Sequence, residues 1–460
     1  MNQVNQEGSQ NCLPCESAPI LTDWNVKKEE KRPVTADNKD RIFSVLYFLV
    51  GYGLIFVFTS ENFWLYGKYL RIFTILYAVT VLSYLFSKGV KPPAESYFWL
   101  AVMLGIGVPF SFWTVLGLLQ ILVLIFTAAY WTLSASGRLL LEKETSQWLF
   151  FDWWNSIAVV PFCNFGCQFQ ILLEKSSVQR DEKKKENPVI SILIGLAIAI
   201  PALLIILPLL SRADAGFENL VGDLLLYVSD HLFLTLIRII LAVPVASYLF
   251  GLAYGGISGR NTDRLNRDGI RQTGKRLRKV PDMAIVTAAA VICGVYLIFI
   301  AIQGDYLFSA FLGVMPEGFI YSEYARRGFF ELCQIGAWNM IILWCAGLFS
   351  KTERENNPGL KIISVCLSIL TLLIIATAMS KMGMYINVYG LTINRVLTMV
   401  FMIWMAIVFL LVILRQKVNI PFARICIMTG AVMFCLLCVL PLESWIQEYN
   451  TWARTMGYIF

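Results

Sequence analysis

Long apolar runs without charged residues restrict the fold of this chain more than any other feature of its sequence. A helix needs about 20 predominantly apolar residues to cross the hydrocarbon core of a bilayer. Only 15% of the 460 residues are charged, whereas soluble domains average about 25%. The uncharged runs therefore predict an all-α, polytopic membrane helix bundle. They are Ile42–Thr59, Pro188–Ser211, Met283–Gln303, Ile362–Ser380, Val396–Leu414 and Ile425–Pro441.

Four further stretches complete the predicted set of spans. Three of them carry one charged residue each, which a membrane helix can hold when that residue faces the bundle interior. The fourth is uncharged but 40 residues long, and Pro109 within it predicts two helices joined by a tight turn. The total is about 11 membrane-spanning helices. The four stretches are Tyr69–Ser87, Ser96–Ala135, His231–Gly256 and Gly328–Phe349.

The distribution of Lys and Arg predicts the orientation of the bundle. With the N-terminus in the cytoplasm, the inside segments hold 29 basic residues and the outside segments hold 8, as the positive-inside rule demands. The reverse orientation would place the Arg-rich stretch Arg260–Lys279 outside. The first 41 residues are polar and of mixed charge, so we expect no cleavable signal peptide. An odd number of spans then places the C-terminus outside.

This topology divides the chain into three parts. Residues 1–41 are a polar cytoplasmic N-terminal tail, residues 42–442 the transmembrane helix bundle, and residues 443–460 a short external C-terminal tail. Within the bundle, segments 136–187 and 257–282 are expected on the cytoplasmic side. The first of these segments mixes Trp and Phe with a few polar residues, which is typical of a helix that lies in the membrane interface.

Charged residues near the outer ends of the spans are the candidate functional residues. Ionisable groups are costly at membrane depth, so they are usually paired or functional there. We expect Glu331 to neutralise Arg238 or Arg395, either as a packing device or within an outward-facing polar pocket for an anionic or polar ligand. Nearby tyrosines belong either to that pocket or to an aromatic belt. The candidate pocket residues are Asp214, Arg238, Tyr321, Tyr324, Arg326, Arg327, Glu331, Tyr385, Tyr389, Thr392 and Arg395.

Three short elements on the outer side carry a family resemblance. Tyr321–Leu332 contains the pattern Tyr-x-x-Tyr-Ala-Arg-x-Gly-Phe-x-Glu-Leu, and Tyr389–Arg395 contains Tyr-Gly-Leu-Thr-x-x-Arg. Arg212–Phe217 matches a small-x-Asp-x-x-Phe element in part, because an arginine stands where a small residue is expected. These elements resemble a bacterial multipass membrane family that is catalogued only as a domain of unknown function. The resemblance covers roughly residues 40–450 and implies a protein of the bacterial cytoplasmic membrane, without an established activity.

Two cysteine pairs are candidates for a metal site. Cys12 and Cys15 form a C-x-x-C motif, and Cys163 and Cys167 form a more widely spaced pair on the same predicted side. Four thiolates there could in principle close one tetrahedral zinc site. The alternative is four free thiols in a reducing compartment. We predict no cofactor.

The cytoplasmic loop 257–282 is strongly basic. It either determines the topology or contacts anionic lipid headgroups or a protein partner in the membrane or cytoplasm. A nucleic-acid partner is not expected, because no soluble segment is long enough to supply a basic face with interleaved aromatics. The basic residues of the loop are Arg260, Arg264, Arg267, Arg271, Lys275, Arg276, Arg278 and Lys279.

Three classes of function remain open. The sequence has no P-loop, dinucleotide glycine fingerprint or nucleophile-elbow serine, so the common enzyme classes are disfavoured. We favour a non-enzymatic envelope-associated sensor, regulator or accessory component. The first alternative is a transporter or flippase of a polar or lipid-linked substrate. The second is an intramembrane lipid-modifying enzyme, which would need acidic groups that converge on one pocket.

Overall fold

The structure is a computed structural model that confirms an all-α polytopic membrane bundle. Within the described residues the chain forms helices and an isolated bridge between Val280 and Ser350, without a strand. Ten helical segments there are long and apolar enough to cross a membrane. The described residues are 37–59, 63–108, 116–140, 144–173, 206, 215–262, 265, 267–309, 329–352 and 357–457.

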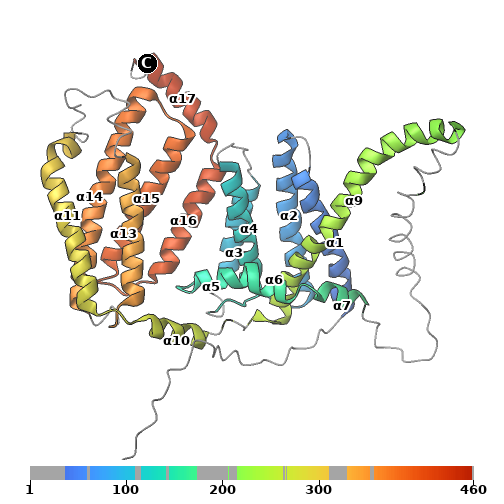
Figure 1. Ribbon diagram of the computed structural model, residues 1–460, viewed down its shortest axis with the longest axis horizontal. Coiled ribbons are helices and arrows are strands. Elements are labelled where there is room, and N and C mark those ends of the chain that lie inside the picture. The colour runs from blue at the N-terminus through green and yellow to red at the C-terminus, as the bar shows by residue number, and fades with distance from the viewer. Residues whose placement is uncertain are drawn as a thin grey trace, which may run out of the picture. The chain divides into compact units, whose positions relative to one another are not determined.

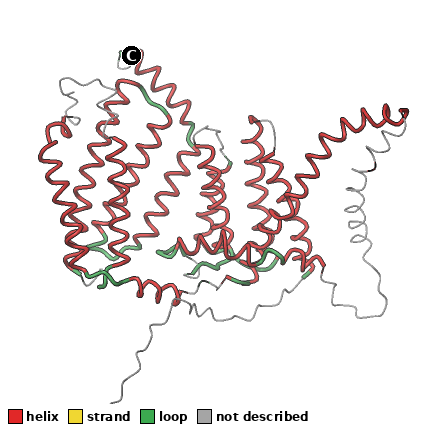
Figure 2. Tube along the Cα trace, in the orientation of Figure 1, coloured by secondary structure: helices red, strands yellow, loops and turns green. Residues whose placement is uncertain are grey.

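Nine of these ten segments coincide with spans predicted from the sequence (Figures 1 and 2). The predicted span Pro188–Ser211 lies outside the described residues except for Ile206. The helices that contain the nine segments are α1 (Asn38–Thr59), α2 (Phe63–Ser87), α4 (Leu116–Ala135), α9 (Ala215–Ser258), α11 (Asp282–Ser309), α13 (Phe329–Phe349), α14 (Pro358–Tyr389), α15 (Ile393–Leu414) and α16 (Phe422–Val439).

The uncharged stretch Ser96–Ala135 forms two helices, as its length predicts. The first is α3 (Ala94–Gly107) and the second is α4, and the two pack against each other. The predicted turn at Pro109 lies outside the described residues. With 14 residues, α3 is about 21 Å long at 1.5 Å per residue, which is shorter than the hydrocarbon core of a bilayer.

The tenth apolar segment, Leu149–Leu173, is broken into short helices. These are α5 (Leu149–Trp154), the π-helical turn η1 (Asn155–Val159), α6 (Val160–Cys163) and α7 (Cys167–Leu173). The segment has the length and composition of a span. In Figure 1, however, its helices lie across the lower ends of α1, α4 and α9. Its predicted interfacial position stays a prediction, which this arrangement supports.

Polar contacts hold this segment against the helix ends. Gln168 Nε2 donates to the backbone oxygen of Ser44 in α1 at 2.8 Å, and Ser247 Oγ in α9 donates to Gln168 Oε1 at 3.0 Å. Tyr248 OH donates to the backbone oxygen of Ile157 at 2.7 Å. Buried polar groups are costly without partners, so these bonds specify where the segment packs.

Small residues let α1 and α9 approach closely. A Cβ atom added at Gly51 would lie 2.8 Å from the backbone nitrogen of Ala246 and 2.9 Å from the backbone oxygen of Ala242. Both alanines are fully buried. Membrane helices associate through such small-residue interfaces, because lipid gives them no hydrophobic drive to associate.

A second group of helices contains α11, α13, α14 and α15. α14 packs against each of the other three, and α16 packs against both α15 and α3. The buried side chains Ile374, Met402, Met405 and Phe409 form the centre of this group. Methionine suits such a centre because its flexible thioether fills irregular gaps between helices.

One boundary differs from the prediction. The helix α14 has 32 residues and continues through Lys381, which directly follows the predicted span Ile362–Ser380. Its end is set by Gly390, where the backbone φ is 76°, a conformation that glycine adopts without steric cost. The predicted external tail begins with the amphipathic helix α17 (Leu442–Thr455), which packs against α15.

Candidate functional site

The turn between α14 and α15 holds four of the predicted pocket residues. Arg395, in the first turn of α15, donates through NH1 to the backbone oxygens of Tyr389, at 3.1 Å, and Gly390. The guanidinium carbon of Arg395 lies 4.2 Å from the ring centroid of Tyr385. Thr392 is the N-cap of α15 and its side chain makes no capping hydrogen bond. The arginine therefore folds back over the end of α14.

This position of Arg395 is favourable for two electrostatic reasons. A cation at the C-terminus of a helix complements the partial negative charge of the backbone carbonyls. A guanidinium over an aromatic ring gains about 0.5–1 kcal/mol at an exposed site and more when desolvated. The rings of Tyr385 and Tyr389 lie 4.9 Å apart. The structure thus brings Tyr385, Tyr389 and Arg395 together at the end of α14, and their membership of a ligand pocket stays a prediction.

Asn450, in α17, joins the external helix to the same turn. The Asn450 side chain accepts a hydrogen bond from the backbone nitrogen of Leu391 at 2.7 Å and donates one to the backbone oxygen of Leu391 at 2.9 Å. The amide thus pairs with both backbone groups of one residue. Sequence reasoning missed Asn450, because nothing in an amphipathic tail distinguishes this amide from a solvated one.

Lys381 lies beneath the turn in α14. It precedes Tyr385 by four residues, so the two side chains share a helix face. The lysine is only 1% exposed, and its neighbours Met382 and Tyr385 belong to the buried cluster of the second helix group. An ionisable residue in a membrane helix is costly and is a candidate for function. The sequence contains one sign that the membrane helix continues past Lys381, because no charged residue follows Lys381 before Arg395.

Arg238 has partners in α1 rather than in α13 or α15. Its Nε donates to Thr59 Oγ1 at 2.8 Å and its NH2 donates to the backbone oxygen of Thr59 at 3.1 Å. Its guanidinium carbon also lies 4.8 Å from the ring centroid of Phe56. Because Thr59 is the last residue of α1, Arg238 caps the C-terminus of that helix.

The predicted pairing of Glu331 with Arg238 or Arg395 is therefore wrong. Among the described residues, no ion pair joins Glu331 to either arginine, and both guanidinium groups bind backbone oxygens instead. Glu331 is exposed in the first turn of α13. An acid in that position is stabilised by the helix dipole. Five other predicted pocket residues lie outside the described residues: Asp214, Tyr321, Tyr324, Arg326 and Arg327.

One of the two predicted cysteine pairs can be placed. Cys163 and Cys167 are free thiols at the ends of α6 and α7, whereas Cys12 and Cys15 lie outside the described residues. Arg260 NH1 lies 2.8 Å from Cys167 Sγ. A guanidinium at that distance repels a metal cation, and the described residues contain no cluster of three potential metal ligands.

The basic loop divides between two environments. Arg260 is half-buried in the network around Cys167 and Asn164, whose Nδ2 donates to the backbone oxygen of Arg260 at 3.0 Å. The remaining basic residues lie on or after α10 (Arg267–Leu277), except Arg264, which lies outside the described residues. A role in lipid or partner contact thus stays a prediction for α10 and the link after it, while Arg260 has a structural partner.

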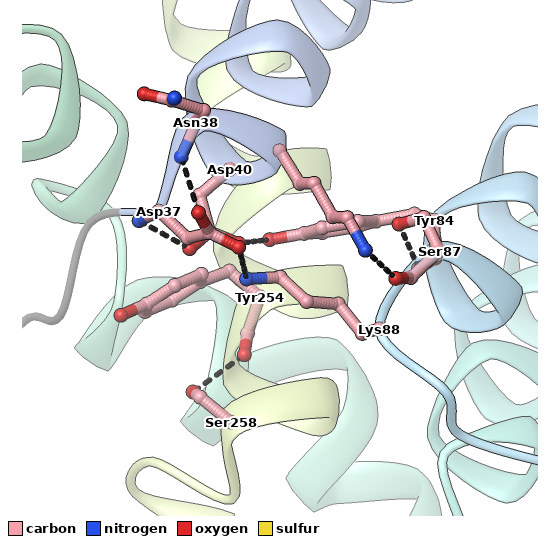
Figure 3. A network of polar contacts seen from close by, with 9 residues as sticks. Asp37, Asn38, Asp40, Tyr84, Ser87, Lys88, Tyr254 and Ser258 are labelled. Carbon is pink, nitrogen blue, oxygen red and sulfur yellow. Dashed lines mark hydrogen bonds and ion pairs between the residues drawn. The ribbon is translucent and has the colours of Figure 1, made fainter.

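Asp40 forms a buried ionic contact that the sequence did not indicate (Figure 3). It is 2% exposed, and its Oδ1 accepts from Tyr84 OH at 2.7 Å and pairs with Lys88 Nζ at 2.8 Å. Its Oδ2 accepts from the backbone nitrogen of Asp37 at 3.0 Å. The carboxylate therefore caps the start of α1 and joins it to the end of α2.

Arg424 forms a second ionic contact between distant parts of the chain. Its guanidinium lies 2.8 Å from Glu95 Oε2 in α3 and 2.8 Å from Glu144 Oε2 in the loop after α4. Glu95 Oε1 also accepts from the backbone nitrogen of Thr145 at 2.8 Å. This contact fixes the start of α16 against α3.

Comparison with known proteins places the chain in a family without giving it an activity. A family model described as Domain of unknown function (DUF4153) matches residues 98–458, which is more than half of the chain. No curated protein and no solved structure matches the chain. The match confirms the predicted resemblance to a family catalogued only as a domain of unknown function, and the chain belongs to the family described as Domain of unknown function (DUF4153).

Proposed function

We propose that this protein is a non-enzymatic, envelope-associated membrane component that binds an anionic ligand at the predicted outer end of α14 and α15. The observation that carries the proposal is the burial of Lys381, only 1% exposed, on the helix face that leads to Tyr385 and Arg395. Ionisable residues inside membrane bundles usually mark ligand or ion sites. We expect the protein to reside in the bacterial cytoplasmic membrane.

The local charge at this end favours an anion. Arg395 is cationic, and the N-terminus of α15 adds the partial positive charge of its first backbone N–H groups. The N-cap Thr392 makes no side-chain hydrogen bond to those groups. Tyr385 contributes a ring that orients the guanidinium. A ligand with a phosphate or carboxylate group would complement this arrangement.

The first test is the response of the purified full chain to inorganic pyrophosphate, a soluble anionic probe. The protein would be placed in nanodiscs of zwitterionic phosphatidylcholine, and its melting temperature followed as pyrophosphate is added. Ligand that binds the folded state raises the melting temperature by mass action. We expect a saturable rise, and we expect Arg395→Gln and Lys381→Met to increase the half-saturating concentration at least tenfold.

Arg415 provides the matched control. It lies directly after α15, at the opposite end from Arg395, and its guanidinium carbon likewise stacks on an aromatic ring, 5.4 Å from the Phe422 centroid. Arg415→Gln should therefore leave the half-saturating concentration unchanged. An equal effect of Arg395→Gln and Arg415→Gln, or no saturable rise in the parent protein, would overturn the proposed ligand site.

The same preparation separates the function classes. Sealed proteoliposomes loaded with buffer would be incubated with labelled pyrophosphate. Binding without uptake or hydrolysis supports the non-enzymatic class. Uptake that depends on Lys381 would instead assign the protein to the transporters, and release of phosphate would assign it to the enzymes.

A further inference from the structure

An apolar groove lies between α11, α13 and α14, at the opposite end of these helices from the Lys381 site. It encloses about 240 Å³. Apolar side chains line it from all three helices, including Ile285, Ala288, Phe349 and Leu367. The polar residue Ser364 also lines the groove, but its hydroxyl donates to the backbone oxygen of Leu360 at 2.6 Å within its own helix. The groove therefore presents a surface that suits a hydrocarbon chain.

The two outer helices of the groove face the surroundings of the protein. Only 11% of the apolar window of α11 and 17% of that of α13 is buried. Large side chains such as Ile298 and Trp344 are exposed on these helices. In a membrane protein such exposed apolar faces contact lipid chains. A lipid chain can therefore enter the groove from the bilayer.

Backbone hydrogen bonds close one end of the groove. Val280, which lines it, donates from its nitrogen to the backbone oxygen of Phe349 at 3.1 Å and accepts from the nitrogen of Lys351 at 3.1 Å. Asp282 accepts hydrogen bonds from Ser350 Oγ at 2.7 Å and from the nitrogen of Thr352 at 3.2 Å. This bridge holds Lys279 and Lys351 on either side of Val280.

Exposed basic side chains gather in the segments that adjoin this end of the groove. Lys279 and Lys351 are both exposed, as are Lys275 and Arg276 in the last turn of α10. α10 packs against α13 and leads into the bridge through residues 278 and 279. The Asp282 carboxylate within the bridge accepts two hydrogen bonds from neutral donors and keeps its negative charge, so the four exposed cations outnumber this acid. A basic rim thus stands where an apolar groove meets the predicted cytoplasmic interface.

We propose that this groove is a binding site for an anionic phospholipid. One acyl chain would lie along α11, α13 and α14, while Lys279, Lys351 and the cations of α10 would bind the headgroup phosphate. An acyl chain matches the apolar lining and an anionic headgroup matches the rim. Free phosphate would use only the rim. The site is independent of the ligand site proposed above, because the two lie at opposite ends of α14.

The test is native mass spectrometry of the full chain with phosphatidylglycerol and with phosphatidylcholine of the same chain length. We expect one phosphatidylglycerol molecule to bind in preference to phosphatidylcholine. Each basic residue near a lipid headgroup contributes roughly fivefold in affinity. The double variant Lys279→Gln with Lys351→Gln should therefore weaken phosphatidylglycerol binding roughly thirtyfold and abolish the preference.

A matched pair of variants tests the groove itself. Ala288 lines the groove and is exposed, whereas Ala290 is exposed on the same helix but does not line it. Ala288→Phe should fill the groove and weaken the binding of the first phosphatidylglycerol at least tenfold. Ala290→Phe should leave it unchanged. Both side chains project from the surface, so both variants should fold, which size-exclusion chromatography and circular dichroism check.

Three results would overturn the proposal. The first is equal binding of phosphatidylglycerol by the parent protein and by the double lysine variant. The second is equal weakening by Ala288→Phe and Ala290→Phe, which would indicate ordinary annular lipid. The third is competition by glycerol phosphate at the same concentration as phosphatidylglycerol, which would indicate a site for a free anion that does not use the groove.

Discussion

Single charged residues at helix ends join neighbouring helices in this protein. Asp40 joins the start of α1 to the end of α2, Arg238 caps the end of α1 from α9, and Arg424 joins the start of α16 to α3. Each of these groups binds a partner or a backbone oxygen, which offsets the cost of removing it from water. Charge at these positions therefore specifies which helix each of these helix ends meets.

The Asp40 contact gives a prediction with a built-in control. Asp40→Ala would leave Tyr84 OH without its buried acceptor and Lys88 without its closest carboxylate, so we expect a loss of about 2–4 kcal/mol in the free energy of unfolding. The neighbouring Asp37 lies 3.5 Å from Lys88, and its side chain is 59% exposed. Asp37→Ala should therefore cost less than about 1 kcal/mol.

The measurement is equilibrium unfolding in mixed micelles as the fraction of denaturing detergent is raised. Both variants remove a carboxylate near Lys88, so their difference isolates the effect of burial. Equal losses for the two variants would show that the buried position of Asp40 contributes nothing.

The hydrogen bonds of Arg238 to Thr59 give a second prediction. Arg238→Gln should remove hydrogen bonds to Thr59 and lower the free energy of unfolding by about 1–3 kcal/mol. Glu331→Gln should change it by no more than about 1 kcal/mol, because that side chain is exposed and gains only from the helix dipole. The same unfolding assay applies. The pairing predicted from the sequence would be supported instead if Arg238→Gln and Glu331→Gln lowered the free energy of unfolding equally and the double variant lowered it no further.

Two elements of this bundle, α1 and the segment around α6, pack closely against α9 at small residues. One face of α9 meets α1 at Ala242 and Ala246, opposite Gly51. Another face meets the segment around α6, where a Cβ atom at Gly255 would lie 2.4 Å from Asn164 Nδ2. Larger side chains on either face would push the partner away, so α9 requires small residues on two sides.

Two glycines in α1 provide a direct test of this packing. Gly51→Ala would place a methyl group within 3 Å of the α9 backbone, so we expect a loss of about 1–3 kcal/mol in the free energy of unfolding. A Cβ atom at Gly53 would meet nothing within 4 Å. Gly53→Ala should therefore be neutral, or stabilising by up to about 1 kcal/mol through helix propensity. If Gly51→Ala were as stable as Gly53→Ala, the close approach of α1 and α9 would be refuted.

The orientation of the whole bundle in the membrane can be tested by cysteine labelling. The positive-inside distribution predicts that α10 faces the cytoplasm and α17 faces outside. The exposed residues Thr273 and Thr451 lie on these two helices. In intact cells, a membrane-impermeant maleimide should label Thr451→Cys, and should label Thr273→Cys only after permeabilisation. The reverse pattern would invert the orientation, and labelling of both in intact cells would contradict the five spans predicted between these two helices.

The sequence alone determined the class of the protein and the limits of most of its spans. A spanning helix must be apolar along its own length, because a bilayer offers no water to solvate polar groups. This is a property of consecutive residues, so runs such as Ile42–Thr59 and Val396–Leu414 identified α1 and α15 directly. Local patterns also brought Tyr385, Tyr389 and Arg395 into one predicted site, because these residues lie close together in the sequence, at the end of α14 and the start of α15.

Only the tertiary structure decided which charged group meets which. Arg238 and Thr59 are 179 residues apart, and Arg424 and Glu144 are 280 residues apart. Hydropathy contains no information about such pairs, since any arginine and any acid at the same side of the membrane look alike in the sequence. The wrong pairing for Glu331 and the missed burial of Asp40 and Lys381 have this common cause. Partner choice depends on how helices pack, and packing depends on the shapes of side chains that are distant along the chain.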